Sequence, residues 1–263
     1  MFNILKYAGV CTQLILFSAT LYSQGLYWES TTTGTIMGGN GRIAKSYYMP
    51  KMFKEIHNGS DESSIFRLDK QLIITVNNKD KTYSEMTFAE LEGMMKKTVG
   101  QLDEKMAEMR DKLKDMPEEQ RKMVEQMIGD KMPGKNKEVK VEVTATGEKK
   151  TISGYACEEY VIKQNGKDLM TLWTSKDVKA FDEMRKDFEE FKSRMAVLTP
   201  MAGKGLAEGM KNLKGFPIQT LLSMGLTSIV TKIEKRSTPP SEFEVPPGYK
   251  KVKSKMFGDE KDE

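Results

Sequence analysis

Few residues in this sequence have the type and spacing that catalysis requires. His57 is the only histidine and no cysteine lies near it, which excludes multi-histidine zinc sites and leaves a histidine relay only through His57 itself. Glu158 and Glu159 are adjacent carboxylates, but neighbouring residues of a strand point to opposite faces, so they are not a ready acid–base pair. The sequence therefore predicts a protein that is not an enzyme and uses no cofactor.

Methionine thioethers are the second group that could do chemistry, because paired sulfurs can bind a soft metal such as copper(I). Three pairs have a suitable spacing: Met49 and Met52, Met106 and Met109, and Met123 and Met127. Apolar packing along a helix explains such methionines without a metal, because the flexible thioether fills irregular gaps. Copper binding is therefore only a remote third hypothesis, and no metal site is predicted.

A third group consists of side chains suited to line an apolar interior. The candidate lining residues are Trp28, Tyr155, Trp173, Phe216, Met106 and Met109. The same residues could equally form an ordinary solid core. A buried tryptophan beside a polar group would favour a ligand site, since the indole N–H needs a partner.

The elements that must position these residues begin with hairpins. Leu26 and Trp28 alternate with Tyr27 and Glu29, and a second strand is expected over 42–49, after a glycine-rich turn. Further along, Leu72, Ile74 and Val76 fall on one face of a strand. A half-buried sheet is the simplest account of this first third.

The period changes at Thr87, where Thr87-x-x-Glu90 has the form of a helix capping box. Apolar residues then recur at alternating steps of three and four, a spacing typical of coiled coils. They are Phe88, Leu91, Met95, Val99, Leu102, Met106, Met109, Leu113 and Met116. This pattern predicts a methionine-rich helical insertion at about 87–131. The same spacing from Val178 to Leu198 predicts a second long amphipathic helix.

Strands return after residue 137. Val139, Val141 and Val143 alternate with polar residues, and Gly147 is expected to turn the chain into a strand over 151–162. Gly154 is interpreted as a bulge, or a close approach of another backbone, within that strand. Asn165-Gly166 predicts a hairpin turn into the next strand.

Residues 1–24 have the features of a signal peptide, with cleavage expected near Ser23 or Gln24. Cys11 lies at the start of the apolar run, which is the wrong place for a lipid-modified cysteine. Once the leader is removed Cys157 remains alone, so a small buried strand residue is expected there and no disulfide. We expect a periplasmic or secreted protein of a Gram-negative envelope, with no transmembrane segment after signal removal and a charged tail at 256–263.

The 42 basic and 38 acidic residues are interleaved, which describes a solvated surface, so no nucleic-acid partner is expected.

Four motifs in order resemble a known family: Gly154-Tyr155-x-Cys157-x-x-Tyr160, Trp173-Thr174-Ser175, Gly215-Phe216-Pro217-Ile218 and Phe243-x-Val245-Pro246-x-Gly248-Tyr249. That family comprises uncharacterised exported bacterial proteins, is known mainly as a domain of unknown function, and is grouped with the LolA/LolB-like lipoprotein carriers. The resemblance is sharpest over 137–250. It implies a strongly curved antiparallel sheet, a half-open barrel with helices on its concave side; in the carriers that hollow holds acyl chains.

The fold class expected is therefore α+β, a half-open β-barrel with long amphipathic helices packed on or beside its concave face. Residues 25–255 are expected to form a single LolA/LolB-like domain. The main functional hypothesis is a non-catalytic envelope protein that binds an apolar small molecule, lipid or lipoprotein inside. The alternative is a structural or partner-binding protein acting through its helices. A hollow interior would favour the first hypothesis, and a filled interior would favour the second.

Overall fold

Alternating burial along short strands shapes the first half of the molecule. The computed structural model describes residues 24–35, 41–114, 117–118, 140–195 and 213–254. Its first six strands, each paired antiparallel with the next, are β1 (Gln24–Gly34), β2 (Arg42–Met49), β3 (Met52–His57), β4 (Glu62–Arg67), β5 (Leu72–Asn77) and β6 (Thr82–Thr87).

The later strands extend the same sheet from the other side of β1. They are β7 (Val141–Ile152), β8 (Tyr155–Gln164), β9 (Lys167–Ser175), β10 (Phe216–Leu222) and β11 (Leu226–Ser237), whereas the short β12 (Lys250–Lys251) joins the sheet at its other end. Strand β11 pairs with β1, and β12 pairs in parallel with β6. The result is one 12-stranded sheet in the order β12-β6-β5-β4-β3-β2-β1-β11-β10-β9-β8-β7, whose ends β12 and β7 do not pair with each other.

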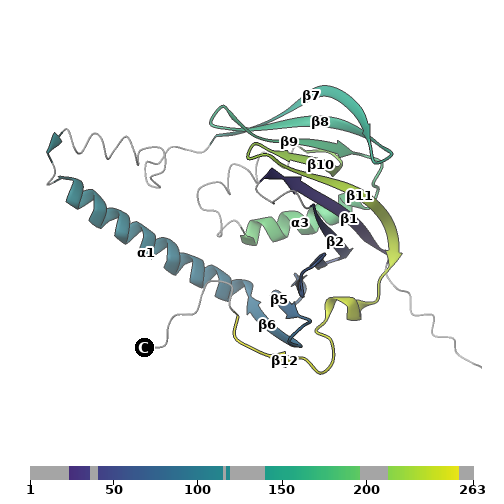
Figure 1. Cartoon of the computed structure of the whole chain (residues 1–263), viewed down its shortest axis with the longest axis horizontal. Helices are drawn as coiled ribbons and strands as arrows, with labels where there is room; N and C mark the ends of the chain where they lie inside the picture. Colours follow the sequence, from purple (N-terminus) through teal and green to yellow (C-terminus); the bar gives the residue numbers. More distant parts are fainter. Residues whose placement is uncertain (1–23, 36–40, 115–116, 119–139, 196–212, 255–263) are drawn as a thin grey trace, which may run out of the picture.

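The expected α+β fold class, with a half-open barrel and long helices on its concave face, is wrong. One open sheet dominates the described residues, and their helices are α1 (Phe88–Lys114), α3 (Phe181–Met195) and the 3₁₀ helix η3 (Pro240–Phe243). Figure 1 shows α3 inside the bend of the sheet, whereas α1 runs from the end of β6 away from it. The periodicity of α1 marks an apolar stripe but does not specify what the stripe packs against.

The start of α1 is where that helix meets the sheet. The capping box forms as predicted: the Thr87 N–H donates to Glu90 Oε2 at 2.7 Å, and the Glu90 N–H donates to Thr87 Oγ1 at 3.0 Å. Phe88 and Leu91 then pack with Ile73 and Met86 of β5 and β6. Met95 is the last described residue of α1 that packs against this cluster, so it is the first turns of α1 that the sheet holds.

The glycines of the β7–β8 hairpin have roles opposite to those predicted. Ile152 pairs with Tyr155, so Ser153 and Gly154 are the two turn residues, with φ of 50° and 83°. Two consecutive positive φ angles match the twist of a two-residue hairpin. Gly147, with φ of 85°, instead lies at an irregularity within β7. The predicted Asn165-Gly166 turn is confirmed, since Gln164 pairs with Lys167.

Both faces of the N-terminal half are covered. We call the face that carries α3 and the start of α1 the inner face. On the outer face Ile65, Ile74 and Val76 pack against Phe243 of η3, which is fully buried. Arg67 holds this C-terminal segment in place, because its guanidinium donates to the Phe243 carbonyl at 3.3 Å and pairs with Glu244.

Several predicted features fall outside the described residues. They are the signal peptide apart from Gln24, most of the helical insertion after Lys114, and the charged tail at 256–263. Among the helices that are described, none is both long and apolar enough to cross a membrane.

Candidate binding site on the inner face

A row of apolar side chains crosses the inner face from strand to strand. Each member lies directly opposite the next in the strand register: Leu26, Tyr48, Phe53, Phe66, Ile73 and Met86. Directly opposed side chains of one face approach closely, so the row forms a continuous apolar surface. Helix α3 lies over its β2 end, and α1 begins over its β6 end.

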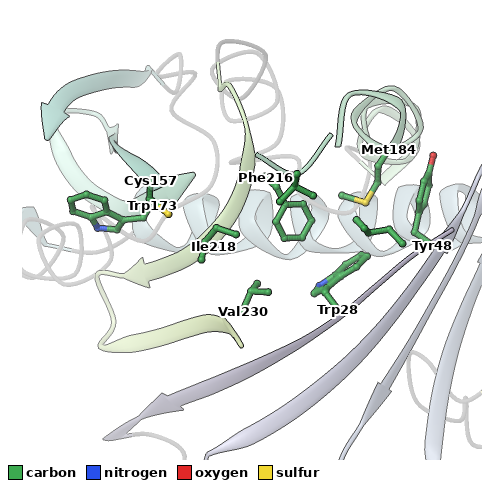
Figure 2. Packing of buried hydrophobic residues seen from close by; sticks show 10 residues of the cluster. Trp28, Tyr48, Cys157, Trp173, Met184, Phe216, Ile218 and Val230 are labelled. Atoms are coloured by element: carbon green, nitrogen blue, oxygen red, sulfur yellow. The ribbon is translucent and has the colours of Figure 1, made fainter. Parts of the chain in front are cut away.

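The part of the inner face under α3 is filled. Figure 2 shows the central cluster, in which Trp28, Phe216 and Ile218 from the sheet meet Met184 from α3. Trp28 and Phe216 are edge to face with ring centroids 5.5 Å apart, and Phe181 of α3 contacts Phe216 in the same way at 5.7 Å. Such contacts are those of a packed core.

A small recess opens beside this cluster, between α3 and the strands β3 and β4. It is lined by Tyr48, Met52, Phe53, Phe66, Leu68, Asp187 and Phe188, and its accessible lining is apolar. Its volume is about 40 Å³. One water molecule needs roughly 10–15 Å³ of such volume, so the recess has room for about three water molecules. Phe53, Phe66 and Phe188 are only half-buried, because their rings border this space.

Asp187 is the charged residue of the lining, and its hydrogen bonds join α3 to β2 and to the β2–β3 turn. Its Oδ2 accepts hydrogen bonds from the Tyr48 hydroxyl at 2.9 Å and from the Lys51 backbone N–H at 2.7 Å. Its Oδ1 lies 2.9 Å from the Lys51 ammonium. Lys51 can present both groups because it follows Pro50 in a two-residue turn with φ of 65°.

The electrostatics keep this carboxylate charged. Burial by itself raises the pKa of Asp187, but the hydrogen bonds from Lys51 and Tyr48 outweigh burial and hold that pKa below its ordinary value. The pKa of the Tyr48 hydroxyl is raised, first by burial and then by its hydrogen bond to Asp187. At neutral pH the site therefore holds an ionised Asp187 and a neutral Tyr48.

The six predicted lining residues lie in different parts of the structure. Trp28, Trp173 and Phe216 are buried in the central cluster, and Tyr155 packs against it. Met109 is half-buried on α1, and the side chain of Met106 lies outside the described residues. None of the five side chains that the structure describes lines the recess.

The residues that do line it were missed as a site. Phe188 lies in the apolar stripe expected from Val178 to Leu198, and no local pattern joins it to Phe53 or Phe66. The signal that was available is the alternation of side chains within each strand, which places Tyr48 of β2 and Phe53 of β3 on one face of the sheet.

The groups first considered for catalysis are not brought together. His57 ends β3 with an exposed ring, and its Nε2 lies 2.9 Å from Glu55 Oε1. Glu158 pairs with Lys176, whereas Glu159 accepts a hydrogen bond from Thr146. The described residues contain no cluster of three or more His, Cys, Asp or Glu side chains suited to a metal ion.

Cys157 is buried as predicted, and its thiol donates to the Tyr155 carbonyl at 3.4 Å. Burial raises the pKa of this thiol, so it stays protonated and unreactive at neutral pH.

Comparison with known proteins adds a family and distant structural neighbours. A family model described as DUF4412, a domain of unknown function, matches residues 93–249, more than half of the chain. A search of curated proteins gives no match. The match confirms the predicted relation to an uncharacterised domain family.

Solved structures with some likeness include PNGF-II in a C2 space group, at a TM-score of 0.38 and 10% identity, covering 88% of this chain and 31% of that one. Another is MucB in complex with MucA(peri), at a TM-score of 0.38 and 7% identity, covering 88% of this chain and 57% of that one. The chain thus spans under a third of the first protein's length and just over half of the second's. Likeness at this level carries no functional inference.

Proposed function

This chain belongs to the DUF4412 family, a domain of unknown function, and we propose its function from its own geometry. It is a non-catalytic exported protein that binds a ligand or partner. The recess between α3 and β3–β4 takes in one compact apolar group of that ligand or partner. The observation that carries this proposal is the recess itself. Half-buried aromatic rings that border a small solvent-open space are suited to binding, since ordinary core rings are covered.

The size of the recess favours a short group over a whole lipid tail. Room for roughly three water molecules accommodates a branched group of a few carbon atoms, but not an acyl chain. The space beside it on the inner face is already occupied by Trp28, Phe216 and Met184. Partner or small-ligand binding is therefore better supported than enclosure of a lipid or lipoprotein.

Export is proposed from the sequence. The apolar run at residues 7–22 after a short basic start, with small Ser23 at its end, fits a cleaved leader. Once such a leader has been removed, the buried Cys157 is also compatible with an oxidising compartment, because no second cysteine remains with which to form a wrong disulfide.

The test uses 3,3-dimethylbutan-1-ol, a neutral probe whose tert-butyl group matches the recess in size. In protein labelled with ¹³C at the methionine methyl groups, the probe is expected to shift the Met52 signal saturably, with that signal assigned by its loss in Met52→Leu. Leu68→Phe fills the recess and should abolish the shift. Leu72→Phe makes the same change beside the outer-face cluster and should leave the shift intact.

An unsaturable shift, or one that survives in Leu68→Phe, contradicts the proposal. Thermal unfolding of each variant establishes that it is folded. If Leu68→Phe does not fold, Phe66→Trp enlarges a lining ring that is half-buried and serves as the second filling variant.

A further inference from the structure

Aromatic rings make up most of the wall of the recess, and they come from the sheet and from α3. Phe53 lies between two of them: its ring centroid is 5.9 Å from that of Phe66 and 5.6 Å from that of Phe188. Tyr48 adds a fourth ring. Aromatic faces carry partial negative charge and attract cations that come within about 6 Å of the ring centre.

The second feature is that the lining offers a ligand no free hydrogen-bonding group. The oxygens of Asp187 are engaged by Tyr48 and Lys51, and the accessible lining is apolar. A primary ammonium or a hydroxyl placed there would lose its water and gain no partner, which is costly. A quaternary ammonium has no N–H and therefore avoids that cost.

The third feature is the sign of the charge at the recess. Asp187 has a side chain only 10% exposed, whereas the side chain of its partner Lys51 is 45% exposed. Water therefore screens the Lys51 ammonium more strongly than the Asp187 carboxylate. The pKa of Tyr48 is raised first by burial, then by its hydrogen bond to Asp187, and after these by the negative charges of Asp187 and Glu183. The recess is thus negative as well as apolar.

From these features we infer that the recess selects a trimethylammonium group over a neutral group of the same shape. This inference rests on the proposed function and names the ligand chemistry of the same site. A trimethylammonium head is as compact as tert-butyl, needs no hydrogen-bond partner, and gains attraction from four rings and from Asp187. Free choline and phosphocholine lipid headgroups both present it.

Choline and 3,3-dimethylbutan-1-ol make the decisive pair, since they differ only in a charged nitrogen in place of a carbon. Titrated against the Met52 methyl signal, choline is expected to bind roughly tenfold more tightly. N,N-dimethylethanolamine, which is protonated at neutral pH and carries an N–H, should bind more weakly than choline. Equal affinities for choline and the alcohol overturn the inference but leave the proposed function standing. Failure of both ligands to bind overturns the proposed function itself.

Two substitutions separate charge from shape. Asp187→Asn and Phe66→Leu should each lower the affinity for choline toward that of the alcohol, while the affinity for the alcohol changes little. Phe181→Leu on α3 makes the same ring-to-aliphatic change outside the lining and should preserve the preference. A preference that persists in both Asp187→Asn and Phe66→Leu overturns the inference. Flotation with phosphatidylcholine vesicles, against vesicles of phosphatidylglycerol, then distinguishes a lipid headgroup from free choline as the source.

Discussion

Asp187 has two consequences at the scale of single residues, because the carboxylate that shapes the recess also fastens α3 to the sheet. It accepts hydrogen bonds from Tyr48 and from the Lys51 backbone, and it pairs with the Lys51 ammonium. Hydrogen bonds to a charged group contribute about 1.5–3 kcal/mol each when the partner is buried. A single-atom change at this side chain therefore tests both the stability of the fold and the charge at the recess.

Asp187→Asn is expected to lower the free energy of unfolding by about 2 kcal/mol at pH 7, measured by urea denaturation. The folded-state pKa of Asp187 lies below its unfolded value, so its stabilisation is complete above the unfolded pKa and is lost as pH falls through the folded pKa. The difference between wild type and variant should therefore shrink below about pH 4. Exposed Asp168→Asn is the control; a constant difference down to pH 2 would refute the assignment.

Residue types alone were sufficient to place Trp28, Trp173 and Phe216 in the interior, because large aromatic residues in one-sided strands bury their rings. They were insufficient for the recess. Phe53 and Phe188 meet only because β3 and α3 pack together, and they lie far apart in the sequence. The partners of Asp187 are likewise set by tertiary packing, and no spacing in the sequence encodes them.

At the scale of elements, the β7–β8 hairpin shows what local sequence can and cannot specify. A positive φ at a glycine is compatible with a turn and with a bulge, and both Gly147 and Gly154 have one. The pairing partners decide between the two roles, and those depend on the register with β8. The Asn165-Gly166 turn was predictable because that dipeptide favours a two-residue hairpin strongly.

Gly154→Ala is expected to destabilise the protein by about 1 kcal/mol. Its added Cβ meets no atom within 4 Å, so the cost comes from the φ of 83° alone. Gly93→Ala in α1 also meets open space but has helical backbone, and it should instead stabilise the protein by up to about 1 kcal/mol. Thermal unfolding of the two variants side by side checks this; equal effects would show that Gly154 is not a turn residue.

The helices illustrate the same limit. The stripe on α1 and that on α3 have the same three-four spacing, yet α3 buries its stripe against Trp28 and Phe216 while α1 leaves the sheet after its first turns. Spacing reports that a helix has an apolar face. The surface that receives that face is a property of the whole sheet.

At the scale of the whole molecule, the two ends of the sheet are protected in different ways. Strand β12 is only two residues long, so it offers little to a second chain. Strand β7 has 12 residues, but the irregularity at Gly147 interrupts it and Lys149 and Lys150 follow. Bulges and lysines on edge strands oppose pairing with other molecules.

Replacing Lys149 and Lys150 together by valine is expected to make the protein aggregate through the exposed edge of β7. The double variant should scatter light at lower temperature and concentration than wild type, because it presents an apolar edge without charge. Lys105→Val with Lys179→Val changes two lysines that lie outside the sheet by the same chemistry and serves as the control. Unchanged scattering in the β7 variant would show that the lysines do not guard this edge.

The pairing of β1 with β11 has a consequence for the order of events in synthesis. Gln24 lies opposite Ser237, and the last strand, β12, closes onto β6. One edge of β1 therefore has no partner until β11 has left the ribosome, and contacts so distant in sequence form slowly. A nascent chain of this topology therefore keeps one edge of β1 open to other molecules until β11 has been made.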